Sequence, residues 1–208
     1  MKLYYSPGAC SIGIHFLLEE LEVPYEAVRI AVRDGDQFKP DYVGVNPKSK
    51  VPALLRDDGS VLTEFAAIAH WLAHAFPDKG MAPSGLENEA RTMEIMDYAV
   101  ATIHMQGFSR LLRPAKFAPN AADHPWVQDM GREIVTKGFG VVSTSLGDNR
   151  FIMGDRLSIA DCSLFYLLFW AVDRQKIDLP RNLADYYARL RDRPSSRKVF
   201  RDENIVFA

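Results

Sequence analysis

The chain has 208 residues, a formal net charge of −2 and two cysteines, and no apolar run approaches the roughly eighteen residues of a membrane-spanning helix. This length is enough for one large domain or two smaller ones, each with a sizeable core. Because acidic and basic residues nearly balance and no long basic run occurs, we expect no nucleic-acid partner and no membrane partner.

The cysteine content favours a reducing environment. Cys10 and Cys162 lie far apart in the sequence and are too few for a secreted disulfide scaffold. The N-terminus turns to Pro-Gly by residue 7, so it lacks the apolar core of a signal peptide. We therefore predict a cytoplasmic protein.

The first twenty residues give the strongest functional signal. An apolar strand is predicted over 2–5, followed by Ser6-Pro7-Gly8 turn chemistry and by apolar residues with the 3.6-residue period of a helix. Cys10 thus falls in the turn or at the start of that helix, where backbone N–H groups and the helix dipole favour a thiolate. Position 13 is Gly, which excludes a C-x-x-C dithiol.

Residues 1–80 are predicted to form a small α/β domain. A second strand is expected over 25–30, a short irregular helix over 35–45, a hairpin over 51–62 with Asp58-Gly59 at its corner, and a helix over 64–75.

Residues 81–85 read as a linker rich in helix breakers, and 86–208 as an all-helical domain. Helices are predicted over 86–112, 125–146, 159–172, 183–191 and 196–202. The fold class is therefore α/β followed by all-α.

Three further motifs carry information. The first two each allow two interpretations, and the third is interpreted in one way. Val51-Pro52 is an ordinary trans strand start by spacing alone, whereas a cis bond would present the Val51 backbone to an extended peptide. Glu64, before Phe65, either complements a helix dipole or grips the zwitterionic end of an amino acid. Ser158 and Asp161 form a capping-box pattern, which we interpret as a folding element.

No metal site is predicted. His70 and His74 have i, i+4 spacing, but the chain lacks a His-Glu-x-x-His pattern and shows no metal-ligand spacing between its histidines and cysteines. A lone His104 within a helix is most often structural.

Taken together, these residues resemble the glutathione S-transferase superfamily, and most of all its bacterial beta class. The matching segments are KLYYSPGACS at 2–11, NPKSKVPAL at 46–54, LTE at 62–64 and LSIAD at 157–161. The resemblance spans the whole chain. It implies a thioredoxin-like N-terminal domain, a helical C-terminal domain, a homodimer, and glutathione as co-substrate.

The resemblance also implies site residues. Cys10 resembles the cysteine beside the glutathione sulfur, and Ser11 or Tyr5 lies at or near the hydroxyl that is catalytic in other classes. The implied glutathione-binding residues are Ala9, Cys10, Lys50, Val51, Pro52, Glu64 and Phe65. The implied walls of the substrate cleft are His104, Phe108 and Leu111.

Three positions depart from the beta-class pattern. Phe65 replaces a common Ser, Met105 replaces a basic residue, and the segment between Ile30 and Asn46 is short, so that Gln37 or Lys39 would meet the glycine carboxylate beside Lys50.

The leading hypothesis is conjugation of glutathione to small hydrophobic electrophiles through a stabilised thiolate. The alternatives are glutathione-dependent thiol–disulfide exchange or reductive dehalogenation through Cys10, and a non-catalytic binding protein on the same fold.

Overall fold

A computed structural model describes residues 1–206, which form two compact units. Among these residues, the first unit comprises 1–82 together with 189–206, and the second comprises 83–188. The sequence-based division placed all of 86–208 in the helical domain, whereas the end of the chain packs with the first unit. Long-range side-chain contacts explain the difference: the guanidinium of Arg193 makes two 2.6 Å hydrogen bonds to the Glu20 carboxylate.

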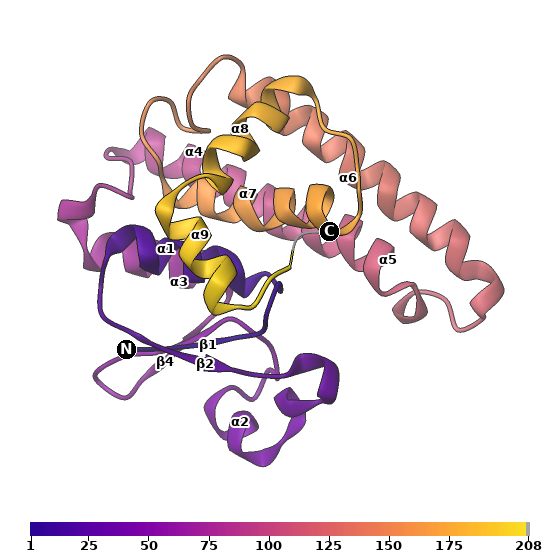
Figure 1. Ribbon diagram of the computed structural model, residues 1–208, viewed down its shortest axis with the longest axis horizontal. Coiled ribbons are helices and arrows are strands. Elements are labelled where there is room, and N and C mark those ends of the chain that lie inside the picture. Colours follow the sequence, from indigo (N-terminus) through magenta and orange to yellow (C-terminus); the bar gives the residue numbers. More distant parts are fainter. Residues whose placement is uncertain (207–208) are drawn as a thin grey trace. The chain divides into compact units, whose positions relative to one another are not determined.

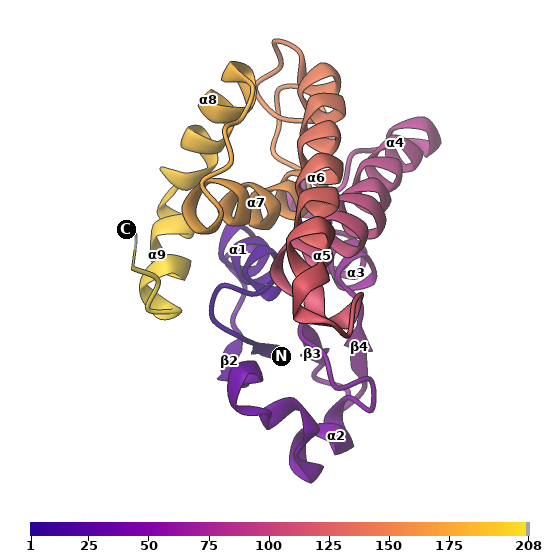
Figure 2. The ribbon, with the colours of Figure 1, turned by 90° about the vertical axis from the view of Figure 1, so that its right-hand side faces the viewer.

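The first unit is built on a four-stranded mixed sheet of order β2-β1-β3-β4. Strands β1 and β2 are parallel, and the pairs β1–β3 and β3–β4 are antiparallel. Helices α1 and α3 lie together on one side of the sheet and α2 on the other (Figures 1 and 2). The elements are β1 Lys2–Tyr5, α1 Ser11–Leu21, β2 Glu26–Arg29, α2 Pro40–Val45, β3 Ala53–Leu55, β4 Val61–Thr63, α3 Phe65–Ala75 and, from the end of the chain, α9 Pro194–Asp202.

The predicted strands, hairpin and helices of this unit are confirmed to within a few residues. The irregular helix expected over 35–45 consists of a 3₁₀ turn at Asp36–Phe38 followed by α2, and another 3₁₀ turn at Val32–Asp34 precedes it. Helix α9 packs against α1, as Figure 1 shows, so α1 is covered by the sheet and by a second helix. This explains why nine of its eleven residues are buried rather than a single stripe.

The second unit is helical, as predicted. Its long first helix is not α-helical throughout: α4 Leu86–Asp97 continues through a π-helical stretch, Tyr98–Phe108, into α5 Ser109–Leu112. The remaining helical segments are α6 His124–Leu146, α7 Ile159–Phe169, a π-helical stretch Trp170–Arg174 and α8 Arg181–Arg191, which ends beyond the boundary of the unit.

The capping box predicted at the start of α7 is confirmed. The Ser158 N–H donates to Asp161 Oδ2 at 2.7 Å, and the fully buried Asp161 carboxylate also accepts from the Ile152 N–H at 2.9 Å and the Tyr186 hydroxyl at 2.6 Å. Burial raises the pKa of Asp161, and these hydrogen bonds oppose the rise. Since every residue of α7 is buried, the polar groups at its start are satisfied within the protein.

Glycines set the contact between α6 and the helix that faces it. A Cβ built on Gly131 would lie 2.8 Å from the Gly107 carbonyl oxygen and from the Leu111 nitrogen. A Cβ on Gly138 would lie 2.7 Å from Ile103. At Gly131 the facing backbone is so close that only hydrogen fits, whereas the neighbour of Gly138 is the side chain of Ile103. Across residues 1–206, no helix has the length and apolarity needed to cross a membrane.

We expect Gly131→Ala to lower the free energy of unfolding by about 1–3 kcal/mol, because the new methyl group meets backbone atoms that cannot rotate away. Gly140→Ala in the same helix is the matched control. Gly140 is exposed and a Cβ added there would have nothing within 4 Å, so the better helix propensity of Ala should stabilise by up to about 1 kcal/mol. Urea unfolding measures both, and changes of the same sign would contradict the close-approach argument.

Candidate functional site

The turn between β1 and α1 places the Cys10 thiol. Gly8 adopts φ 68°, a left-handed conformation that suits glycine, and the Ala9 N–H closes the turn on the Ser6 carbonyl at 2.9 Å. Cys10 is half-buried and is the N-cap of α1. Its predicted position at the helix start is confirmed. The first turn of α1 carries no acidic side chain, so the positive end of the helix dipole is not neutralised there.

Cys10 faces a second loop. Its Sγ lies 3.4 Å from the carbonyl oxygen of Val51, the residue before Pro52. The Val51–Pro52 peptide bond is cis, which is the alternative considered above and contrary to the trans bond that spacing alone favoured. The thiol therefore sits beside a half-buried stretch of backbone suited to pairing with an extended peptide.

Ser11 has a different environment. Its side chain is fully buried, its Oγ accepts from the Ser6 N–H at 3.1 Å, and its hydroxyl lies 3.3 Å from the Ser6 carbonyl oxygen. The Ser11 hydroxyl thus ties the turn together, and Cys10 is the group of this pair that reaches the site surface.

Two buried side chains, Asn46 and Tyr42, hold the loop that carries Val51. Asn46 is 1% exposed, and its amide donates to the Lys50 carbonyl at 2.8 Å and accepts from the Lys48 N–H at 3.0 Å. The Tyr42 hydroxyl donates to the same Lys50 carbonyl. Burial raises the pKa of Tyr42 to about 12, so the hydroxyl remains a donor at neutral pH.

Glu64 lies at the N-cap of α3, with its carboxylate exposed. The Lys48 ammonium lies 2.8 Å from Glu64 Oε1 and 2.9 Å from the Thr63 hydroxyl. This ion pair was not anticipated from the sequence. Phe65, the next residue, turns its ring into the core, where it is 6% exposed.

Three residues are predicted from the sequence to contact the glycine carboxylate of glutathione: Lys50, Lys39 and Gln37. Lys50 is exposed and makes no ion pair within residues 1–206. Lys39 is paired with Asp36 at 2.5 Å, and Gln37 is buried. Lys50 is therefore the best placed of the three to meet a carboxylate.

Glu203 is a site-supporting residue that sequence reasoning missed. One of its carboxylate oxygens accepts from the Gly8 N–H at 2.8 Å, and the other lies 2.9 Å from His15 Nδ1. The carboxylate is fully buried, which raises the pKa of Glu203, and the His15 hydrogen bond acts in the opposite direction. A contact spanning 195 positions leaves no local signal in the sequence.

The predicted substrate residues lie in the second unit. His104 is half-buried in the π-helical stretch, its Nδ1 is 3.3 Å from the Tyr166 hydroxyl, and its ring meets Trp170 edge-on at 4.8 Å. Phe108 and Leu111 differ from the expectation: they are 0% and 3% exposed and belong to the core between helices. Of the three residues, only His104 is accessible.

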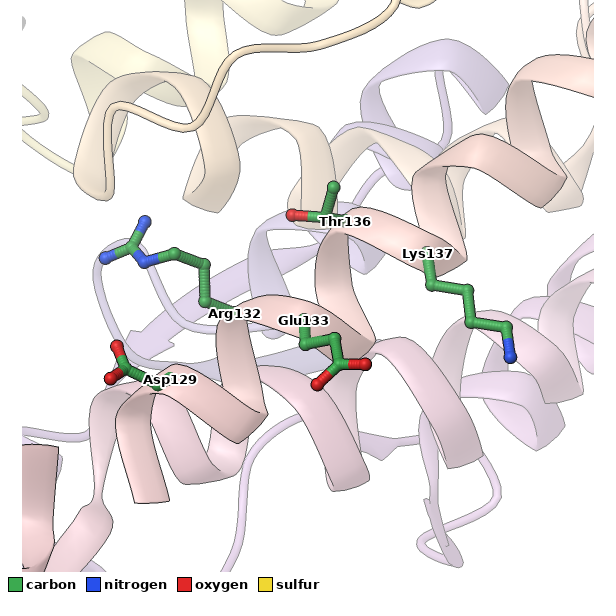
Figure 3. Close-up of a pocket in the computed structure, with 5 residues that line it drawn as sticks. All are labelled: Asp129, Arg132, Glu133, Thr136 and Lys137. Carbon is green, nitrogen blue, oxygen red and sulfur yellow. The ribbon is translucent and has the colours of Figure 1, made fainter. Parts of the chain in front are cut away.

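A hollow of about 520 Å³ lies elsewhere in the same unit, along α6, and Figure 3 shows that all its lining side chains project from that one helix. It contains none of the predicted site residues. The lining residues are exposed and polar: Asp129, Arg132, Glu133, Thr136 and Lys137.

Comparison with known proteins gives a consistent result. Residues 8–75 match the family model of the glutathione S-transferase N-terminal domain, and 114–189 match that of the C-terminal domain. The chain is 34% identical to glutathione S-transferase GstA of Escherichia coli O157:H7, over 99% of this chain and 100% of that protein.

Two solved structures are similar over nearly the whole chain. A Sulfitobacter glutathione transferase homologue with bound glutathione has a TM-score of 0.89 and 26% identity, covering 99% of this chain and 98% of its own. The bacterial beta-class glutathione S-transferase of Sphingomonas chungbukensis has a TM-score of 0.85 and 31% identity, covering 99% and 100%.

The loop contacts predict a reactivity change. Asn46→Ala removes the two hydrogen bonds that the Asn46 side chain makes to the loop and keeps the one from Tyr42, so we expect a loss of about 1–3 kcal/mol in the free energy of unfolding. We also expect faster alkylation of Cys10 by iodoacetamide, measured by mass spectrometry.

Cys162 is fully buried and serves as the internal reference for global unfolding. The exposed Asn88, whose amide donates to the Ser84 carbonyl, provides the control Asn88→Ala. If Cys10 in Asn46→Ala reacts at the wild-type rate, the loop does not shield the thiol.

Proposed function

The chain belongs to the glutathione S-transferase family, and from this premise we propose how its residues hold glutathione and activate its sulfur. The protein is a glutathione transferase with glutathione as co-substrate. The role of each residue in that reaction is our inference. It rests on one observation above all: the Cys10 thiol lies against the backbone of Val51, at the start of α1.

Glutathione would bind as an extended tripeptide along the Val51 loop. The Val51 backbone would pair with its cysteinyl residue, as strand addition to an edge does. The Glu64 carboxylate would take the α-ammonium of the γ-glutamyl end, and the first-turn amides of α3, beginning at Phe65, would take its α-carboxylate. The ammonium of Lys50 would meet the glycine carboxylate at the other end.

This placement brings the glutathione sulfur to the N-terminus of α1, beside Cys10 and Ala9. The glutathione thiol, with an unperturbed pKa of about 8.5, must lose its proton before it attacks. The helix dipole and a hydrogen bond from the Cys10 thiol would stabilise the resulting thiolate. The thiolate then attacks the electrophilic carbon, a new C–S bond forms, the leaving group departs with its electron pair, and the proton is released to solvent.

The substrate would be a small hydrophobic electrophile, and of the three residues that the family resemblance implies for its cleft, His104 is the accessible one. Glutathione S-transferases are typically homodimers. We propose the same for this chain, in a reducing, cytoplasmic compartment suited to thiol chemistry.

A second activity is favoured by the position of Cys10 itself. A half-buried thiol at a helix start can act as a nucleophile towards a glutathione-containing disulfide. Its thiolate would displace one thiolate and form a Cys10–glutathione mixed disulfide. A second glutathione thiolate would then attack that bond, releasing Cys10 and oxidised glutathione.

Cys10→Ala separates the two activities. In a conjugation assay with glutathione and a chlorodinitrobenzene acceptor, we expect kcat/KM to fall about ten- to a hundredfold, because one hydrogen bond to a charged sulfur is lost. The pH midpoint of kcat/KM should move upward. Exchange with bis(2-hydroxyethyl) disulfide should be lost altogether. Steady-state kinetics across pH measures both activities.

Cys162→Ser is the matched control for the loss of a thiol, with its folding checked by circular dichroism. Retained exchange in Cys10→Ala would discard the second activity. Complete loss of conjugation in that variant, with glutathione still bound, would show that Cys10 does more than hydrogen-bond the thiolate.

A further inference from the structure

Titratable side chains converge between α1 and α9, away from the Cys10 turn. A ring nitrogen of His15 and one carboxylate oxygen each of Glu19 and Asp202 all lie within 4.8 Å of one another. His15 and Glu19 are four residues apart on α1 and therefore share a face, and Asp202 is the last residue of α9. The two helices pack side by side within the first unit (Figure 1).

The histidine in this cluster has one ring nitrogen in use and one unused. His15 is fully buried, its Nδ1 lies 2.9 Å from Glu203 Oε1, and its Nε2 has no hydrogen-bond partner. When a neutral imidazole donates its Nδ1–H to a carboxylate, Nε2 keeps its lone pair. Carboxylate–histidine pairing of this kind orients histidines that bind metal ions. The cluster therefore combines two carboxylates with a buried histidine that has one ring nitrogen without a hydrogen-bond partner.

A cation already contacts the two carboxylates. The Lys198 ammonium lies 2.9 Å from Glu19 Oε1 and 2.5 Å from Asp202 Oδ2. Lys198 does not reach His15 Nε2, however, which remains unsatisfied. Its side chain and that of Asp202 are 47% and 39% exposed, so the lysine is able to swing away into solvent and open the cluster.

We propose that His15 Nε2, Glu19 and Asp202 bind a divalent first-row metal ion of the Zn²⁺ type, which displaces the Lys198 ammonium. One nitrogen and two carboxylate oxygens, completed by water, are a ligand set that Zn²⁺ and Co²⁺ accept. Glu203 orients the histidine from behind. The ion would join α1 to α9 and stabilise the first unit, and it takes no part in the transfer reaction.

The test uses Co²⁺ as a coloured substitute for Zn²⁺ on full-length protein treated with a chelator. We expect one equivalent of Co²⁺ to bind with visible absorption, and Zn²⁺ to raise the melting temperature. Asp202→Asn should weaken binding at least about tenfold by removing a ligand charge. Lys198→Met should tighten Co²⁺ binding roughly tenfold. The ion then no longer has to displace the Lys198 ammonium from its two ion pairs, with Glu19 and Asp202.

Two controls remove similar ion pairs outside the cluster. Lys79→Met breaks the 2.9 Å pair with Glu22 near the end of α1, and Asp192→Asn breaks the 3.1 Å pair with Arg197. Neither should alter Co²⁺ affinity. The proposal is overturned if Lys198→Met binds no Co²⁺ at millimolar concentration, or if Asp202→Asn keeps the wild-type affinity. Conjugation activity is measured separately, on protein from which the chelator has removed metal ions. The outcome of the metal-binding test therefore does not decide whether the protein catalyses conjugation.

Discussion

A buried carboxylate at the end of the chain holds the turn at its beginning. Glu203 accepts from the Gly8 N–H with one oxygen and contacts His15 Nδ1 with the other, and no solvent reaches it. A carboxylate removed from water must satisfy its oxygens within the protein, so its partners are fixed in position. The turn that carries Cys10 and the helix that carries His15 are therefore oriented by a single group. The geometry of the thiol depends on it.

Buried hydrogen bonds also fix the loop that carries Val51, but here the buried groups are neutral. Asn46 and Tyr42 both direct donors to the Lys50 carbonyl, and neither side chain has an alternative partner in solvent. The backbone at Val51 is thus presented at a defined angle before any ligand arrives. Preorganisation of this kind reduces the entropy that binding would otherwise cost. By contrast, Lys48 and Glu64 form an exposed pair, which leaves the recognition of charge at that end adaptable.

Features specified by neighbouring residues could be predicted from the sequence. The Pro-Gly turn places Cys10, the Asp58-Gly59 corner defines the hairpin, and Ser158 with Asp161 defines the start of α7. Features specified by distant residues could not. The Gly8–Glu203 contact, the Lys48–Glu64 pair and the inclusion of α9 in the first unit each join segments whose proximity arises only on folding. The burial of Phe108 could not be predicted for a related reason, because helical periodicity identifies an apolar face but not what covers it.

The discontinuity of the first unit has a consequence for the order of biosynthesis. Residues 1–82 leave the ribosome before the second unit, but α9, Arg193 and Glu203 emerge after it. The second unit, 83–188, is contiguous and already complete at that point. The first unit is therefore begun before the second unit and completed after it. During translation, the Cys10 turn gains its Glu203 contact only after residues 83–188 have been synthesised.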